Sequence, residues 1–173
     1  LATDGYEQSE LVVPRDRLRE AGAEVTVVSP KSGRIRGWKE KDWGDEVAVD
    51  MTLEQARAGD FDALVLPGGR GPEYLRTYPA VVAMVRHFFE ANKPVAAICH
   101  AAQLLAGADV LKGRSCSAYP ACQVEVERAG GTYAQIPIDG AFTEGNLVSA
   151  PAWPAHPAWI GQFLALLGTK INL

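Results

Sequence analysis

The stretch KPVAAICHAAQLL, residues 93–105, decides the fold of this chain. Val95–Ile98 is a short apolar run, typical of a strand that is buried on both faces in a parallel sheet. From His100 onward the apolar residues have helical spacing, and no turn residue separates the two segments. Cys99 and His100 therefore lie at a strand-to-helix junction. A side chain there is held out on a sharp bend at the start of a helix, and this is where a cysteine becomes a nucleophile.

Strand and helix signals alternate along the rest of the chain. The apolar run Asp62–Pro67 predicts a second buried strand, and the amphipathic stretch Pro79–Ala91 predicts the helix that connects it to residues 95–98. Further strands are predicted at residues 24–29, 46–50, 114–117 and 132–134, further helices at 9–21, 53–58, 100–108 and 158–167, and hairpins within 31–45 and around 144–146. Such alternation is typical of an α/β fold with a mostly parallel sheet between two helical layers.

Ligands of such a fold bind at the carboxyl ends of the strands. Three segments would meet at this edge of the sheet, namely residues 4–8, 67–73 and 98–101. The main candidate site residues come from these three segments.

The composition is that of an ordinary globular protein and excludes several function classes. Of the 173 residues, 47% are hydrophobic and 22% are charged, and the net charge is −4. This length suits a single domain, residues 1–173, whose first strand we expect to begin before residue 1 because Leu1–Gly5 resembles the end of a strand. The sequence has no basic run or basic face, so we do not expect nucleic-acid binding. It also has no apolar stretch that reaches the roughly 20 residues of a membrane span. Three cysteines without a framework spacing favour free thiols in a reducing, cytoplasmic compartment.

Cys99 and His100 are the first two catalytic candidates. The helix start would stabilise a thiolate at Cys99, and the backbone amide of His100 would point at an oxyanion formed on a bound substrate. The His100 side chain could act as a general acid or base. The alternatives are a small, buried, apolar cysteine and a histidine that points into solvent.

An acidic side chain and backbone amides at the same sheet edge complete the predicted site. A carboxyl at Glu7 could share a proton with the thiol, unless it only favours the first turn of the helix that follows. A backbone amide of Gly69 or Arg70 could complete an oxyanion hole. The loop at residues 68–73 matches neither the dinucleotide fingerprint nor the P-loop spacing, so we do not expect nucleotide binding.

Glu73 and His156 are weaker candidates. Glu73 lies on an exposed loop, where a solvated role is the default, and His156 lies in a proline-rich loop where it could line the pocket. Cys116 and Cys122 lack the spacing of a CxxC pair, and no HExxH motif occurs. We therefore expect neither a metal nor another cofactor.

Five segments appear in the order and spacing of one known family. They are DGYE at residues 4–7, FDALVLPGG at 61–69, PVAAICH at 94–100, GADVLKGR at 107–114 and GNLVS at 145–149. With these segments the chain resembles the ThiJ/PfpI superfamily, most closely its PfpI branch of intracellular-protease-I-like proteins. The resemblance covers nearly the whole chain and depends on the combination of segments, because any one of them alone would be weak.

The resemblance implies a flavodoxin-like three-layer sandwich related to class I glutamine amidotransferase domains. It implies that Cys99 is the nucleophile on a nucleophile elbow with His100 beside it, and that Glu7 hydrogen-bonds the sulfur. Gly69 and the His100 amide would form the oxyanion hole. The resemblance also implies a homodimer or a larger homo-oligomer, in which Glu73 reaches His100 of a neighbouring subunit.

Two places depart from the family pattern. Ala101 and Ala102 stand where many relatives have glycine and proline, and Ala101 is kept among the candidate oxyanion and substrate-binding positions. Residues 150–157, an apolar stretch that contains Trp153, replace an arginine that many relatives carry shortly after Ser149. This departure puts in doubt any binding of a substrate anion there, and with it any carry-over of substrate specificity.

Two functions from different classes fit this pattern. In the first, a stress-protection hydrolase, Cys99 attacks a carbonyl of a peptide, of a small 2-oxoaldehyde or of a glycated thiol or amine adduct, while His100 moves protons and Glu7 tunes the thiol. The short loops favour a small carbonyl or adduct over a folded protein as substrate. In the second, a redox sensor or chaperone-like stress protein, Cys99 is oxidised to a sulfenic or sulfinic acid. A scaffold that has lost activity is less consistent with the joint presence of Glu7, Cys99, His100 and Glu73.

Overall fold

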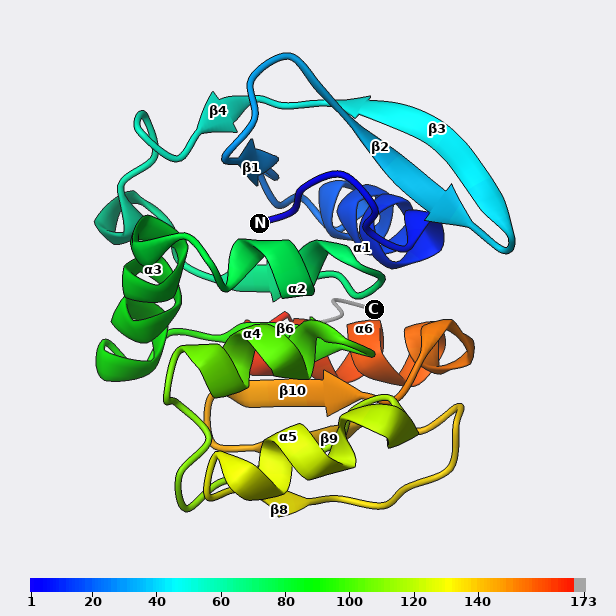
Figure 1. The fold of residues 1–173 in the computed structure, drawn as a ribbon, viewed down its shortest axis with the longest axis vertical. Helices are drawn as coiled ribbons and strands as arrows, with labels where there is room; N and C mark the ends of the chain where they lie inside the picture. Colours follow the sequence, from blue (N-terminus) through cyan, green and yellow to red (C-terminus); the bar gives the residue numbers. More distant parts are fainter. Residues whose placement is uncertain (170–173) are drawn as a thin grey trace.

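The computed structural model describes residues 1–169 and centres on a four-stranded sheet (Figure 1). Its strands follow the order β5 (Leu64–Leu66), β6 (Val95–Ile98), β10 (Leu147–Ala150) and β9 (Phe142–Glu144). The first three are parallel, and β9 runs antiparallel to β10. The carboxyl ends of β5, β6 and β10 therefore share one edge of the sheet, as the sequence predicted.

A second parallel pair, β1 (Val28–Ser29) and β4 (Met51–Thr52), lies beyond β5. Residues 1 and 2 connect the two sheets, since the amino group of Leu1 donates to the Val65 carbonyl and the Ala2 amide donates to the Val28 carbonyl, both at 3.0 Å. The predicted strand at 24–29 is shorter in the structure, where only its last two residues pair. Residues 24–27 instead border a groove of about 870 Å³ that also runs along β5.

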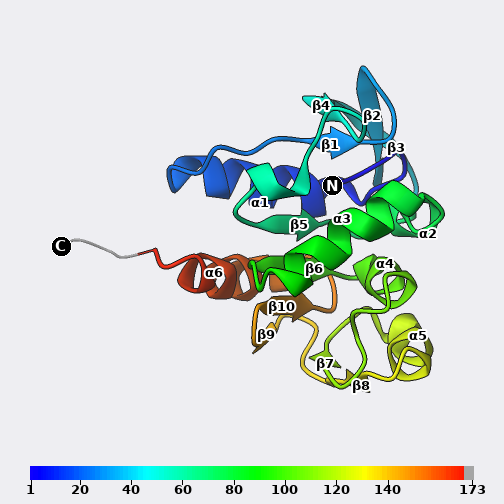
Figure 2. The ribbon, with the colours of Figure 1, turned by 90° about the vertical axis from the view of Figure 1, so that its left-hand side faces the viewer.

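Helices cover both faces of the central sheet (Figure 2). One layer holds α1 (Gln8–Glu20) and α6 (His156–Leu166). The other layer holds α2 (Gly71–Leu75), α3 (Pro79–Glu90), α4 (Ala101–Gly107) and α5 (Gln123–Arg128). The arrangement is a flavodoxin-like three-layer sandwich.

Strands β5 and β6 are apolar along their whole length because the sheet is covered on both faces. Successive side chains of a strand point to opposite faces. Val95 and Ala97 of β6 accordingly belong to the core under α3 and α4, whereas Ala96 and Ile98 belong to the core under α6. All four side chains are at least 98% buried.

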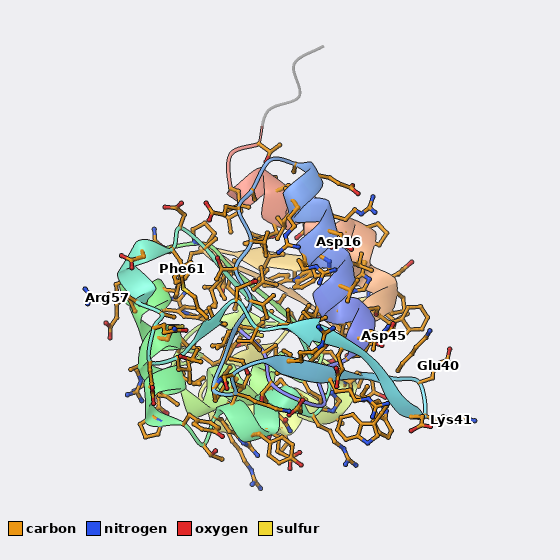
Figure 3. All side chains as sticks on the ribbon, turned by 90° about the horizontal axis from the view of Figure 1, so that it is seen from above. Asp16, Glu40, Lys41, Asp45, Arg57 and Phe61 are labelled. Carbon is orange, nitrogen blue, oxygen red and sulfur yellow. The ribbon has the colours of Figure 1, made fainter. Side chains whose placement is uncertain are left out.

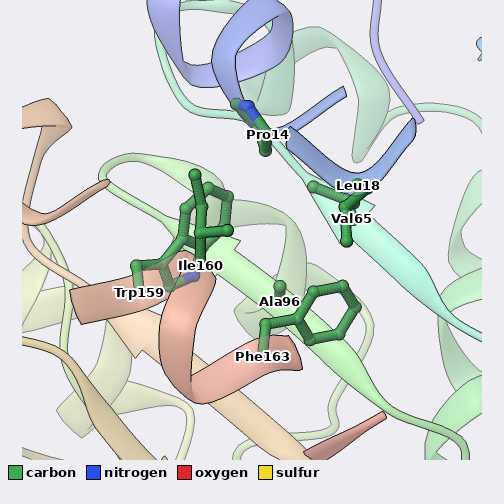
Figure 4. Close-up of a pocket in the computed structure, with 7 residues that line it drawn as sticks. All are labelled: Pro14, Leu18, Val65, Ala96, Trp159, Ile160 and Phe163. Carbon is green, nitrogen blue, oxygen red and sulfur yellow. The ribbon is translucent and has the colours of Figure 1, made fainter. Parts of the chain in front are cut away.

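Apolar side chains fill the seam between α1 and α6 (Figure 4). The residues that line it are Pro14 and Leu18 of α1, Trp159, Ile160 and Phe163 of α6, and Val65 and Ala96 of the sheet. Trp159 is 1% exposed, and its indole N–H donates to the Val148 carbonyl at 3.4 Å. The seam has no room for a water-sized molecule, so it is packing and not a binding site.

A long hairpin, β2 (Arg34–Lys39) with β3 (Asp42–Ala48), lies over the amino-terminal end of α1, and its turn is at Glu40 and Lys41 (Figure 3). It is longer than the small hairpin that the sequence predicted, and it takes up most of the strand expected at 46–50. The Gln8 side chain connects it to α1, because its amide donates to the Asp45 carboxylate at 2.9 Å and its oxygen accepts from the Asp45 backbone amide at 2.7 Å. The start of α1 is thereby fixed against the hairpin.

Two predictions of local structure were wrong. Residues 53–55 form a turn and Ala58 begins the 3-10 helix η1 (Ala58–Asp60), because six residues without a buried side chain are too short to sustain an α-helix. Conversely, α5 was not predicted; it follows the 3-10 helix η2 (Pro120–Cys122), and one of its two valines, Val124, is exposed. The remaining small elements are β7 (Ser115–Cys116), β8 (Thr132–Tyr133) and η3 (Trp153–Ala155).

Among residues 1–169, no helix is both long and apolar enough to cross a membrane. In the same part of the chain, His, Cys, Asp and Glu side chains form no group of three or more that could hold a metal ion.

Candidate active site

Cys99 lies on the predicted sharp bend between β6 and α4. Its φ angle is +60°, a left-handed conformation that non-glycine residues rarely adopt and that costs about 1–3 kcal/mol. Two hydrogen bonds hold the bend: the Cys99 amide donates to the Ala150 carbonyl at 2.9 Å, and the Tyr119 amide donates to the Cys99 carbonyl at 3.2 Å. Backbone strain that is kept in place by neighbouring segments is characteristic of functional sites.

A buried carboxyl from α1 lies beside Cys99, and it belongs to Glu10. The Glu10 side chain is fully buried, and its Oε2 accepts a hydrogen bond from the Gly68 amide at 2.8 Å. A Cβ atom added to Gly68 would overlap this Oε2 and would lie 2.6 Å from the Cys99 Cβ. Glu10 and Cys99 therefore meet over Gly68, which has to lack a side chain.

This placement corrects the prediction for Glu7. The Glu7 carboxylate caps the amino terminus of α1, where it accepts from the Ser9 hydroxyl at 2.5 Å and from the Glu10 amide at 2.9 Å. A residue three positions later in a helix lies almost one turn further along the same side. That turn carries the Glu10 side chain into the interior, while Glu7 stays at the helix end.

Burial controls the protonation of Glu10. Burial first, and the nearby charge of Glu7 second, raise the pKa of this carboxyl to about 8, while hydrogen bonds with the Gly68 amide, the Cys99 thiol and the Trp153 amide limit the shift. Glu10 is therefore predominantly protonated at neutral pH. A protonated carboxyl can donate a hydrogen bond, which a carboxylate cannot.

Burial also raises the pKa of the Cys99 thiol, and the charge of Glu10 adds to this, so the thiol isn't acidic in the isolated chain. The backbone amides of His100 and Gly69 favour the thiolate but are outweighed. The expectation of a thiolate stabilised by the helix start is thus not supported in the free chain, since α4 has only seven residues and Cys99 is 8% exposed. Activation of this thiol requires a base.

His100 is placed to be that base. Its Nδ1 lies 3.2 Å from the Cys99 sulfur, and its ring stacks on Tyr119 with centroids 4.9 Å apart and an interplanar angle of 23°. Burial lowers the pKa of His100, whereas the charges of Glu125 and Glu73 raise it. At neutral pH the ring is therefore mainly neutral and can accept the proton of the thiol.

The remaining predicted residues divide into those near the sulfur and those engaged elsewhere. The Gly69 amide favours the ionised form of the Cys99 thiol, as an oxyanion donor must. The φ angle of Gly69 is +78°, a conformation suited to glycine. The Arg70 amide donates to the Gly5 carbonyl at 2.8 Å, so it is occupied and the prediction of an oxyanion donor there is not supported. Ala101 is fully buried at the start of α4, which limits any contact with substrate to its backbone.

Glu73 and His156 lie at the periphery. Glu73 is exposed as predicted, but it lies in helix α2 and not on a loop, and it is close enough to influence His100 through its charge. His156 begins α6 and stacks on Trp159 with centroids 6.2 Å apart. None of the contacts found for His156 reaches Cys99.

Trp153 forms part of the wall beside Glu10. It follows β10, its backbone amide acts on the Glu10 carboxyl, and its side chain is 60% exposed, the largest value among the exposed large apolar residues. Sequence reasoning missed the places of Glu10, Tyr119 and Glu125 at this site. Glu10 has the i, i+4 spacing of Pro14 and Leu18, and a charged residue within such an apolar helical face is the one signal that could have indicated it.

The comparison that decides the family covers almost the whole chain. A model of the DJ-1/PfpI family matches residues 1–166. The chain belongs to the DJ-1/PfpI family. A deglycase of Thermococcus kodakarensis is 40% identical over 171 residues, which cover 96% of this chain and 96% of that protein.

Other DJ-1/PfpI proteins carry this domain within longer chains. The DJ-1 homolog D of Arabidopsis thaliana is 41% identical over 186 residues, which cover 99% of this chain and 48% of that protein. A crystal structure from Anabaena variabilis shows a two-domain protein with a DJ-1/ThiJ/PfpI-like and a ferritin-like domain. It superposes on this chain with a TM-score of 0.86 at 30% sequence identity, and the match covers 95% of this chain and 46% of that one. This chain therefore spans about half the length of these two proteins.

Proposed function

We propose that this chain is a cysteine-dependent stress-protection hydrolase that acts on a small carbonyl, preferably a glycated thiol or amine adduct, with peptides as the other substrate class. The observation that carries the proposal is the 3.2 Å contact between the His100 Nδ1 and the sulfur of a strained Cys99. The name of the 40% identical Thermococcus relative, a deglycase, supports the same reaction class.

The geometry supports a simple first step. As the sulfur of Cys99 attacks the carbonyl carbon, the thiol proton passes to Nδ1 of His100, a carbon–sulfur bond forms and the carbonyl π electrons move to oxygen. The amides of Gly69 and His100, which act on the sulfur in the free chain, would stabilise the resulting oxyanion. Protonated Glu10 adds a third donor.

For a peptide, His100 returns its proton to the leaving amine, and the thioester that remains is hydrolysed by water to the acid. For an adduct of methylglyoxal, the amine or thiol leaves the hydroxyl-bearing carbon and frees the aldehyde, which the Cys99 sulfur attacks. Transfer of the hydrogen on this carbon to the neighbouring ketone carbon then converts the Cys99 hemithioacetal into a lactyl thioester, which one water hydrolyses to lactic acid and the free thiol of Cys99. Neither reaction requires an external oxidant or reductant.

The test is turnover of the adduct between methylglyoxal and N-acetylcysteine, followed by the lactate formed. Wild-type protein and Cys122→Ser should release lactate, whereas Cys99→Ser should fall to the uncatalysed rate. Equal rates for wild type and Cys99→Ser, with this adduct, with the N-acetyllysine adduct and with peptides, would refute the proposal.

A second candidate is a redox sensor, and one observation favours it. Protonated Glu10 beside Cys99 can donate to a sulfinate oxygen, which stabilises the oxidised cysteine. Mass spectrometry after exposure to micromolar peroxide would show Cys99 oxidised well before Cys116 and Cys122, and Glu10→Gln would preserve this order while Glu10→Ala abolishes it. Indiscriminate oxidation of all three cysteines would exclude the sensor.

We also propose a homodimer or a larger homo-oligomer in which the exposed Glu73 approaches His100 of a neighbouring subunit. The exposed position of Glu73 on α2 leaves its carboxylate free for such a contact. Light scattering at micromolar concentration should give a mass of at least twice 18.6 kDa, and a monomer would exclude a shared site.

A further inference from the structure

The groove of about 870 Å³ lies between the two sheets of the chain, away from Cys99. One wall is formed by residues 25–28, which lead into β1, and the other by residues 63–65, which lead into β5. Strand β1 is an edge of the two-stranded sheet and β5 is an edge of the four-stranded sheet. The groove therefore separates two strand edges that face each other.

Backbone groups of both walls point into the groove. Consecutive residues of a strand direct their N–H and C=O groups to opposite sides. The Leu64 amide donates at 2.9 Å to the segment that leads into β6, so the backbone of Val65 faces the groove. The Val27 carbonyl accepts from two amides at the start of β4, at 2.9 and 3.2 Å, so the backbone of Val28 faces the groove as well. Strand edges of this kind are templates for a further strand.

Residues 1 and 2 already bond both walls at one end of the groove. The nitrogen of Leu1 donates to the Val65 carbonyl and the Ala2 amide donates to the Val28 carbonyl, both at 3.0 Å. Consecutive residues that bond opposite neighbours are characteristic of a strand in the middle of a sheet. Figure 2 shows the amino terminus at this place, between β1 and β5.

The surroundings of the Leu1 nitrogen suit a peptide amide. Burial lowers the pKa of this amino group to about 5, because a charge is costly there. An ammonium group has three donors, whereas a peptide nitrogen has one. The Val65 carbonyl satisfies one donor and points across the groove as a strand partner would.

Both faces of the groove are apolar. Leu11 of α1 and Leu164 of α6 line one face, and Met84 and Phe88 of α3 line the other. A strand between two such layers has to be apolar at every position, as β6 is. Val25 and Leu164 are only half-buried, so a strand in the groove would cover them.

We propose that this groove is a strand-acceptor site for an extended apolar segment that is joined to the nitrogen of Leu1 and lies parallel between β1 and β5. Residues 24–28 span about 13 Å at roughly 3.3 Å per residue, so about four to five residues fill the groove. The added strand joins the two sheets into one. It also provides a partner for residues 24–27, which the sequence predicted to be a strand but which pair with no strand in the described part of the chain.

The first test compares the melting temperature of the full chain with that of two extended chains. One carries five valine and alanine residues before Leu1, and its matched control carries an extension of the same length in which aspartate replaces every second residue. The apolar extension should raise the melting temperature by roughly 5 °C or more. The alternating extension should raise it by less than about 2 °C, because no face of the groove accepts a charge.

The second test is amide hydrogen exchange followed by NMR. In the chain with the apolar extension, the amides of Val28 and Val65 should exchange at least about tenfold more slowly, since the added strand accepts their hydrogen bonds. Strand β9, at the far edge of the four-stranded sheet, is the internal control and should keep its exchange rates.

Three results would overturn the proposal. The first is an equal melting temperature for the two extended chains, and the second is a rise in melting temperature without slower exchange at Val28 and Val65. The third would arise if residues 170–173 filled the groove instead: exchange at both amides would then be slow without any extension, and the apolar extension would change neither readout. None of these measurements involves Cys99, so the result is independent of whether the proposed hydrolase activity is found.

Discussion

Replacing Gly68 by alanine tests whether Glu10 and Cys99 really meet at this position. The new Cβ would overlap the Glu10 Oε2 and would lie 2.6 Å from the Cys99 Cβ and 3.0 Å from the Ile98 carbonyl oxygen. Neither the Ile98 carbonyl nor the Cys99 Cβ is the flexible end of a side chain, and Glu10 cannot withdraw without losing its hydrogen bond to the Gly68 amide. Something in the strained bend has to shift.

The expected loss is about 2–3 kcal/mol of unfolding free energy, which is typical of overpacking a tight interior. For a chain of this size it corresponds to a melting temperature lower by roughly 5–10 °C. Urea unfolding followed by tryptophan fluorescence measures it, because Trp159 is buried. The same variant should alter the alkylation rate of Cys99.

Gly161→Ala is the matched control. A Cβ there meets nothing within 4 Å, and the residue lies on the exposed side of α6, so alanine should stabilise the helix by about 0.5–1 kcal/mol. If Gly68→Ala unfolds within 0.5 kcal/mol of the wild type, the carboxyl and the thiol do not converge as described.

Two further predictions concern the buried groups. Because the pKa of Glu10 is raised, the folded chain keeps a proton that the unfolded chain releases near pH 4.5, so the free energy of unfolding should fall as pH rises between about pH 5 and 8. Urea melts at several pH values measure this slope, and Glu10→Gln should flatten it. An unchanged slope in this variant would show that Glu10 ionises normally. Trp159→Ala should lower the free energy of unfolding by about 3–5 kcal/mol, because it empties the seam between α1 and α6. Trp153→Ala changes a side chain that is 60% exposed and should lower it by less than about 1 kcal/mol. Similar losses for both variants would contradict the packing.

Much of the fold could be predicted because its strongest signals are local. The wholly apolar run at residues 95–98 and the amphipathic run at 79–91 form β6 and α3 with bounds that differ by at most one residue from those predicted. Strand–helix alternation gave the layered sheet, and the hairpin around residues 144–146 is present as β9 and β10. Short elements were less predictable, because 53–58 and α5 depend on packing against segments distant in sequence.

The sequence predicted the bend that carries Cys99 and His100, but not the residues that surround these two side chains. Cys99 and His100 are adjacent in sequence, so the end of one strand places both of them. The carboxyl was placed one helical turn too early, at Glu7 instead of Glu10, since sequence alone does not show which turn of α1 reaches the bend at Cys99. Burial, which opposes the predicted thiolate and outweighs the short helix in the free chain, is a property of the assembled core and is not visible in the sequence.

The left-handed backbone at Cys99 has a consequence for inactive variants of the chain. Serine or alanine at this position inherits the uncomfortable torsion and so preserves the shape of the reactive centre. Glycine would be at ease there, and a chain carrying it would exchange chemistry for a more relaxed bend. Replacement by glycine is thus a change at Cys99 that the backbone itself would favour.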